Sequence, residues 1–113
     1  MALRWPDKDP DELLDYTVDW SRFLGSLTIS SVIWKFIQND GTESSTLSNS
    51  DTFNGITVNN QTNTSTTATI VLNGGTANID NKLVCQITTS SSPKTSAAIV
   101  TKRIIHLRVR ERS

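Results

Sequence analysis

The chain is poor in the residues that most often carry chemistry. Among its 113 residues there is one cysteine, Cys85, and one histidine, His106. A single histidine leaves no Ser-His-Asp or Cys-His arrangement that the sequence supports. Metal binding has no better basis, because there is no cysteine pair and the acids between residues 7 and 15 lack the spacing of a calcium loop. The sequence therefore predicts a protein that is not an enzyme and that holds no metal or cofactor.

Disulfides, long apolar runs and aromatic residues are also scarce or missing. One cysteine excludes an intrachain disulfide, and together with the lack of a signal peptide this predicts folding in a reducing cytoplasm. Aromatic residues make up only 6%, whereas serine and threonine number 30 and asparagine 9. This composition favours short strands and polar turns over helices. At this length there is room for one domain, with about 100 residues being typical of a seven-stranded sandwich.

Net charge is zero, but the two ends of the chain are oppositely charged. Residues 7–19 hold six acids and one base, and residues 100–113 hold five bases and one acid. One interpretation is that these ends meet, within a subunit or between neighbours, since complementary charge sets register and partner choice. The alternative is that both are solvated faces. Zero net charge and the lack of interleaved aromatics make nucleic acid a poor candidate for the primary partner.

The most regular pattern starts at Leu14. Leu14, Tyr16, Val18 and Trp20 alternate with polar residues, which predicts a half-buried strand. Just before it, Asp9 can cap a single helical turn with Pro10 at its first position and Glu12 three residues after the cap.

Residues 1–13 carry few apolar side chains, with Leu3 and Trp5 as the obvious anchors. Ordering a backbone costs about 1–2 kcal/mol per residue, while each large buried side chain contributes about 1.5–3 kcal/mol. The sequence therefore predicts an arm that is mobile alone and becomes ordered against a partner through Trp5. The alternative is that Trp5 folds back onto the sandwich.

Further strands follow the same alternation. They are predicted at residues 28–37, 56–58, 66–73, 83–87 and 97–111, with a short edge strand at residues 52–54 inside a polar loop and with polar loops at 59–64 and 88–94. Trp34 and Cys85 fall on inward faces, so Trp34 is predicted in the core and Cys85 as a buried structural thiol. The last strand exceeds the usual five or six residues, which predicts that its C-terminal end projects from the body.

Several of these stretches together carry a resemblance. Lys8-Asp9-Pro10-Asp11-Glu12 and Leu14-Asp15-Tyr16-Thr17-Val18-Asp19-Trp20-Ser21, the Trp34 strand, the Asn73-Gly74-Gly75 turn and the basic C-terminal strand resemble small virion proteins of tailed phages, the fibre-tail adaptors. The resemblance implies an all-β fold, a single Ig-like antiparallel β-sandwich over residues 14–113 with an extended N-terminal arm over residues 1–13. It implies a place in the tail apparatus and no catalytic activity. Residues 40–63 depart from the family pattern.

The sequence and the resemblance together predict an adaptor that joins tail fibres to the tail or baseplate of a virion, with multiple copies in a symmetric assembly. Expected partners are other tail proteins, and neither nucleic acid nor a membrane. The predicted partner-binding residues are Leu3, Trp5, Pro6, Lys8, Pro10, Arg108, Arg110 and Arg112. Two alternatives stay open: a neck, collar or capsid-decoration protein of the same fold, and an Ig-like module that binds a host surface or carbohydrate through residues 40–63.

Overall fold

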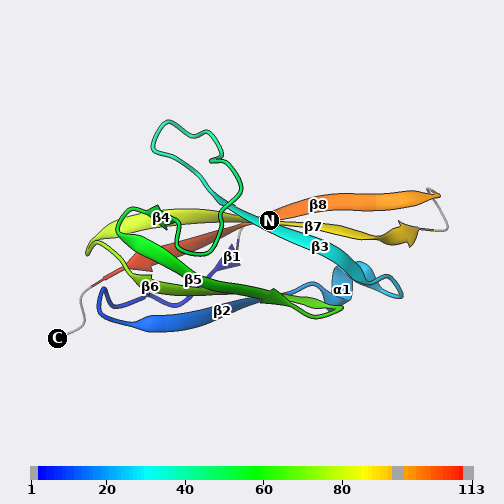
Figure 1. Ribbon diagram of the computed structural model, residues 1–113, viewed down its shortest axis with the longest axis horizontal. Coiled ribbons are helices and arrows are strands. Elements are labelled where there is room, and N and C mark those ends of the chain that lie inside the picture. The colour runs from blue at the N-terminus through cyan, green and yellow to red at the C-terminus, as the bar shows by residue number, and fades with distance from the viewer. Residues whose placement is uncertain (1–2, 93–95, 111–113) are drawn as a thin grey trace.

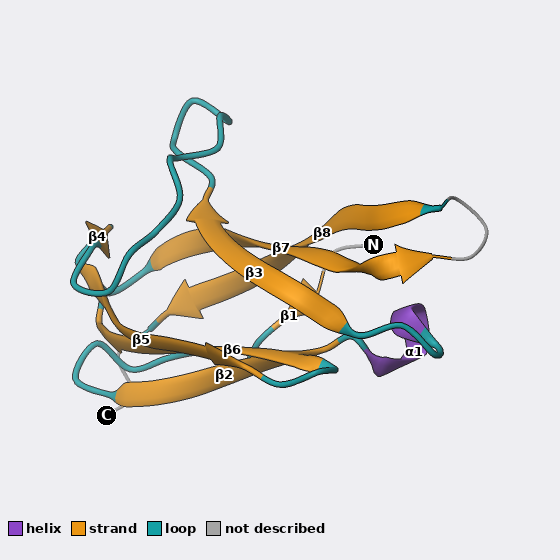
Figure 2. Ribbon diagram, turned by 45° about the vertical axis from the view of Figure 1, so that its right-hand side comes forward, coloured by secondary structure: helices purple, strands orange, loops and turns teal. Residues whose placement is uncertain are grey.

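Two four-stranded sheets pack face to face in the computed structural model, which describes residues 3–92 and 96–110 (Figures 1 and 2). The first sheet has the strand order β1-β8-β7-β3 and the second has the order β2-β6-β5-β4. All pairs are antiparallel except β1, which runs parallel to β8. The predicted all-β sandwich is confirmed.

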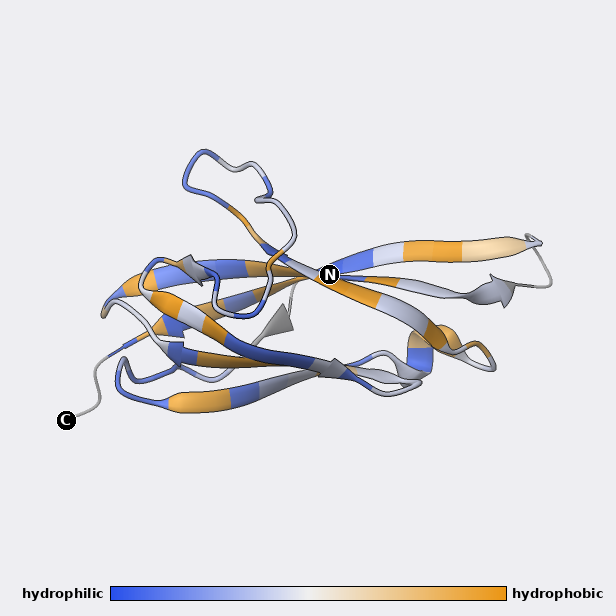
Figure 3. Ribbon diagram, viewed as in Figure 1, coloured by the Kyte–Doolittle hydropathy of each residue, from blue (hydrophilic) through white to orange (hydrophobic). Residues whose placement is uncertain are grey.

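The elements follow one another as β1 (Leu3–Arg4), β2 (Leu13–Asp19), α1 (Ser21–Leu24), β3 (Ile29–Phe36), β4 (Thr52–Phe53), β5 (Ile56–Asn63), β6 (Thr67–Gly74), β7 (Ile79–Ser92) and β8 (Ala97–Val109). Figure 3 shows hydrophilic and hydrophobic residues alternating along several of these strands, as expected where one face meets the core and the other meets solvent.

The core lies between the two sheets and contains the residues that the alternation selected. In β2, Tyr16 and Val18 are buried while the intervening residues are exposed. Trp34 of β3 and Cys85 of β7 are register partners and both are buried. The prediction that Trp34 and Cys85 belong to the core is confirmed.

Polar segments extend further as strands than their composition indicated. The predicted loop at 59–64 continues β5 to Asn63, where Gln61 and Thr62 pair with Ile70 and Thr69 of β6. The predicted loop at 88–94 continues β7 to Ser92, and residues 93 and 94 lie outside the described residues. Backbone pairing explains both differences, because a strand on a solvated sheet face tolerates polar side chains as long as its ladder is complete.

The strand predicted over residues 97–111 does not project at its described C-terminal end, so the prediction is wrong there, and residue 111 lies outside the described residues. Val109 is fully buried and forms a parallel bridge with Lys8. It is the opposite end of the β7–β8 hairpin that extends, since β3 begins at Ile29 opposite Thr89 (Figure 1). The register between the two hairpin strands shifts by one extra residue on the β7 side, which leaves β8 itself regular.

Candidate protein-interaction surface

The N-terminal segment, residues 3–12, runs along one edge of β8. After the β1 pairing, the Trp5 N–H donates to the His106 carbonyl at 2.9 Å. The Lys8 N–H donates to the Arg108 carbonyl at 2.9 Å, and the Lys8 carbonyl accepts the Arg110 N–H at 2.7 Å. The segment is thus held as an added parallel strand of the first sheet.

Trp5 closes the side of the sandwich where this segment crosses between the sheets. Its side chain is only 8% exposed. The ring stacks on Tyr16 of β2 with 4.5 Å between centroids and lies 6.1 Å from Trp34 of β3. Because Tyr16 and Trp34 belong to opposite sheets, Trp5 joins both sheets to the N-terminal segment.

Lys8 is fully buried and its ammonium group is surrounded by backbone carbonyls. Its Nζ donates to the carbonyl of Asp9 at 3.0 Å, to that of Gly74 at 2.7 Å and to that of Glu12. Burial lowers the pKa of Lys8, and the carboxylates of Glu12, Asp9 and Asp11 oppose that shift. The ammonium therefore ties the N-terminal segment to the β6 turn of the second sheet.

The chain between Lys8 and β2 is a closed turn. The Glu12 N–H donates to the Asp9 carbonyl at 3.1 Å, and the Asp9 N–H donates to Glu12 Oε1 at 2.9 Å. The Glu12 side chain thus returns to the Asp9 N–H as in a capping box, whereas Asp9 Oδ1 accepts the Asp11 N–H at 2.9 Å. The turn does not develop into a helix, because the Gly74 N–H binds the Glu12 carbonyl and β2 starts at Leu13.

This placement differs from the expectation of an arm that is unpacked in the isolated chain. The few buried apolar groups are supplemented by the backbone bonds to β8 and by the carbonyls that accept from Lys8, neither of which is visible in the sequence. Pro6 is exposed, Pro10 is half-buried, and Leu3 lies in β1 beside Ile105. The structure thus brings the predicted N-terminal residues together along β8, with Trp5 and Lys8 facing inward.

Two of the three predicted arginines are described: Arg108 lies near the C-terminal end of β8 and Arg110 directly follows it. Arg108 forms an ion pair with Asp80 at 2.8 Å, and Arg110 lies 3.8 Å from Asp7. Arg112 lies outside the described residues. The Asp7–Arg110 pair shows that the oppositely charged ends of the chain do meet within one subunit at this point.

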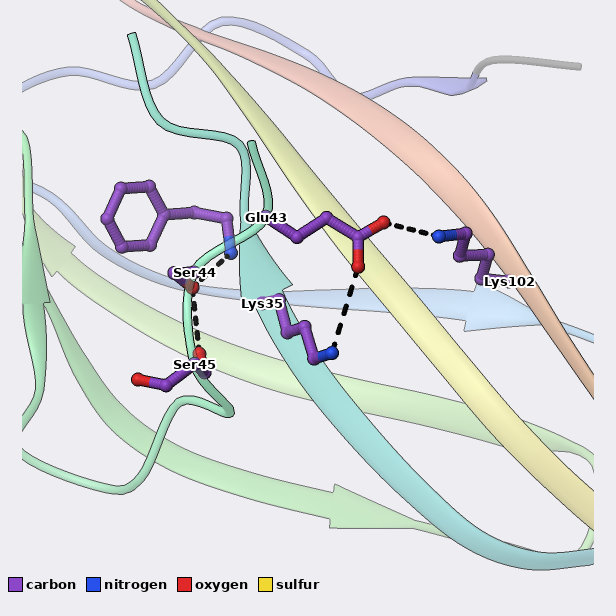
Figure 4. A network of polar contacts seen from close by, with 6 residues as sticks. Lys35, Glu43, Ser44, Ser45 and Lys102 are labelled. Atoms are coloured by element: carbon purple, nitrogen blue, oxygen red, sulfur yellow. Dashed lines mark hydrogen bonds and ion pairs between the residues drawn. The ribbon is translucent and has the colours of Figure 1, made fainter. Parts of the chain in front are cut away.

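A charge cluster on the outer face of the first sheet joins its strands to the loop after β3. Glu43 of that loop lies between Lys35 of β3, at 3.7 Å, and Lys102 of β8 (Figure 4). The hydrogen bond from Lys102 is the largest influence that lowers the pKa of Glu43, with a smaller contribution from Lys35. Fully buried Val84 lies between Lys35 and Ile104 in the strand register, on this face.

Replacing Glu43 by glutamine should flatten the acid limb of the stability curve. Because the pKa of Glu43 is lower in the folded chain than in the unfolded chain, its contribution is present at neutral pH and is lost as pH falls below about 4.3. We expect a small loss at pH 7 and a shallower decline between about pH 4.5 and pH 3, measured by urea unfolding. The exposed Asp15→Asn is the control, and a decline as steep in Glu43→Gln as in the unmodified chain would contradict the assignment.

Cys85 and His106 point to opposite sides of the first sheet, Cys85 toward the core and His106 away from it. Burial raises the pKa of Cys85 to about 12, so its thiol is protonated at neutral pH. His106 lies on the outer face of β8 opposite Lys82. Among the described residues there is no group of three or more potential metal ligands, and no helix is long and apolar enough to cross a membrane.

A shallow hollow of about 420 Å³ lies beside the loop that follows β3. Its lining residues are Phe36, Gln38, Asn39, Asp40 and Asn54. Phe36 is also stacked on Phe53, with 4.8 Å between ring centroids. The hollow contains no acid–base pair and no nucleophile, so its geometry supports no reaction.

One edge of β8 is only partly paired, which the periodicity of the sequence does not reveal. Alternate residues of a strand direct their backbone groups to opposite edges. The carbonyls of His106 and Arg108 accept bonds from Trp5 and Lys8, so the even-numbered residues of β8 face the N-terminal segment. That segment pairs with the C-terminal half of β8 only.

The N-terminal half of β8 continues this edge, and no described residue pairs with it there. Ile99 donates its N–H to Thr89 Oγ1 on β7 at 3.0 Å, which confirms that odd-numbered residues face the other way. Ala98, Val100 and Lys102 therefore direct their N–H and carbonyl groups outward. Within the described residues, β7 is the only strand paired with this stretch.

Comparison with known protein families identifies the chain. Residues 8–101 match the family described as podophage GP4 fiber-tail adaptor protein gp77. The chain belongs to this family. The resemblance noted in the sequence is thereby confirmed, and the adaptor is a structural component of a phage tail. No curated protein and no solved structure matches the adaptor significantly.

Proposed function

We propose that the adaptor joins tail fibres to the tail or baseplate through protein–protein contacts. The family match over residues 8–101 carries this proposal, because the family is named for attaching a fibre to a tail. Several copies act together in the symmetric tail, and neither nucleic acid nor a membrane is a primary partner. The adaptor performs no catalysis and is made in the host cytoplasm before assembly.

The contacts use backbone edges and charged rims of the sandwich. At one end of the sandwich, exposed Arg110 and Pro6 lie beside the N-terminal segment and are offered to a partner. Arg112, which lies outside the described residues, is proposed as a further basic contact. Leu3, Pro10 and Arg108 border the same end. Trp5 and Lys8 are buried, so they contribute to this contact surface indirectly, by fixing the path of the N-terminal segment against β8.

Virions assembled without the adaptor test the proposal. We expect particles with intact heads and tails whose fibre-bearing fraction, counted by electron microscopy, falls at least tenfold and is restored by supplying the unmodified chain. Intact fibres on particles with unstable heads or necks would contradict the proposal and would favour the neck or decoration role.

A further inference from the structure

Residues 98–102 of β8, whose outer edge pairs with no described strand, differ from the edges of β2 and β4. β2 presents Asp15 and Asp19 on its outer face, and β4 has only two residues. Such charges, short strands and covering loops are the usual protection of an edge against further pairing. Residues 98–101 contain neither a charge nor a proline.

The edge of β3 is protected against further strand pairing in two ways. The loop after β3 covers its C-terminal half, where Ser44 and Leu47 donate their N–H groups to the carbonyls of Phe36 and Trp34. A bulge between Ile29 and Ser31 interrupts its other half. The outer edge of β5 beyond its short pairing with β4 is uncharged too, but its residues 60–63 are all polar. Among the described edges, the stretch at 98–102 is therefore the regular and uncovered one that carries an exposed apolar residue, Val100.

Its side chains also suit a partner strand. Val100 is 59% exposed, the highest fraction among the large exposed apolar residues. Figure 3 shows the start of β8 as a hydrophobic stretch at the far end of the hairpin. Five residues span about 17 Å, enough for a strand of ordinary length to pair through several backbone bonds.

Lys102 is already paired with Glu43, but Lys35 and Lys102 together leave one excess positive charge in that cluster, which favours an acidic partner. The Lys102 side chain is half exposed, and Arg103 lies 4.3 Å above the Trp20 ring and donates to the Asp19 carbonyl. A second copy pairing through the same stretch would bring these bases close to their equivalents. The excess positive charge attracts a strand that carries acidic residues, whereas it repels a second copy of the same basic stretch.

We propose that residues 98–102 of β8 receive an extended, acidic β-strand from another virion protein. The strand pairs with the outward N–H and carbonyl groups of Ala98, Val100 and Lys102, places an apolar side chain beside Val100 and sets an acid near Lys102. It continues the edge on which the adaptor's own β1 is already added. This proposal rests on the proposed function, since it specifies how the adaptor is held in the tail.

Val100→Pro tests it, because proline removes an outward N–H and leaves the bonds to β7 intact. The control Val100→Thr keeps the N–H and the β-branched shape. A second control, Thr101→Pro, removes an N–H that faces β7 and should unfold the hairpin. We expect the melting temperature of Val100→Pro to stay within about 5 °C of the unmodified chain.

In virions supplied with each variant, we expect Val100→Pro to lower the number of fibre-bearing particles at least tenfold, and Val100→Thr to leave it unchanged. Ala98→Pro should give the same loss and replaces Val100→Pro if that variant does not fold. Normal fibres on particles carrying either folded proline variant would overturn the proposal. Sedimentation of the purified adaptor as a dimer that Val100→Pro abolishes would also overturn it, because the occupant would then be a second copy.

Failure of this inference and failure of the proposed function are distinguishable. If particles without any adaptor keep their fibres, the adaptor role itself is wrong. If those particles lose their fibres while particles with folded Val100→Pro keep them, only the strand-addition site is wrong.

Discussion

Replacing Trp5 by alanine is expected to lower the free energy of unfolding by about 3–5 kcal/mol. The Trp5 ring is 8% exposed and lies against Tyr16 of one sheet and Trp34 of the other. Removing it leaves a cavity at the point where both sheets and the N-terminal segment meet, and the neighbouring rings cannot fill it without moving the segment. Urea unfolding followed by far-UV circular dichroism measures the change.

The matched control is Leu13→Ala. Leu13 is also a large apolar residue near the start of the chain, but it is 54% exposed, and its loss should cost less than about 0.5 kcal/mol. Trp5→Phe should fall between the two, since it keeps an aromatic ring in the same place. If Trp5→Ala were as stable as Leu13→Ala, Trp5 would not belong to the folded core, and the prediction of a free arm would stand.

The sequence predicted the parts of this fold that depend on alternation. Along residues 14–20 the period of two placed Leu14, Tyr16, Val18 and Trp20 inside; the last three are buried, and Leu14 is partly buried against the core. Trp34 and Cys85 were assigned inward on separate strands, and the structure makes them direct partners. These assignments succeed because a side-chain period of two is a local property of a strand with one face in the core.

The position of the N-terminal segment depends on contacts that the sequence does not display. Trp5 meets His106 and Tyr16, and Lys8 meets Gly74, so each contact joins residues distant in the chain or in different sheets. A lysine among acids normally indicates a solvated surface, and no pattern in the sequence distinguishes Lys8 from such a residue. The open edge of β8 cannot be read from the sequence either, because it depends on where along β8 the pairing with β1 begins.

Replacing Lys8 by methionine is expected to lower the free energy of unfolding by about 2–3 kcal/mol. Methionine retains an apolar stem of similar length, so little volume is lost. What is lost is the ammonium, which donates to the carbonyls of Asp9, Glu12 and Gly74. Those carbonyls would then face an apolar side chain, and a buried polar group without a partner costs more than the net value of the bond it loses.

Lys82→Met is the control, because Lys82 is exposed on the outer face of β7 and its replacement should change stability by less than about 0.5 kcal/mol. Native-state hydrogen exchange separates local from global effects: Lys8→Met should release the amide of Gly74, which binds the Glu12 carbonyl, before that of Trp34 in the core. Equal protection of both amides in Lys8→Met and in the unmodified chain would show that the ammonium does not hold the segment. The segment would then be held by Trp5, by its backbone bonds to β8 and by the bond from the Gly74 N–H to the Glu12 carbonyl.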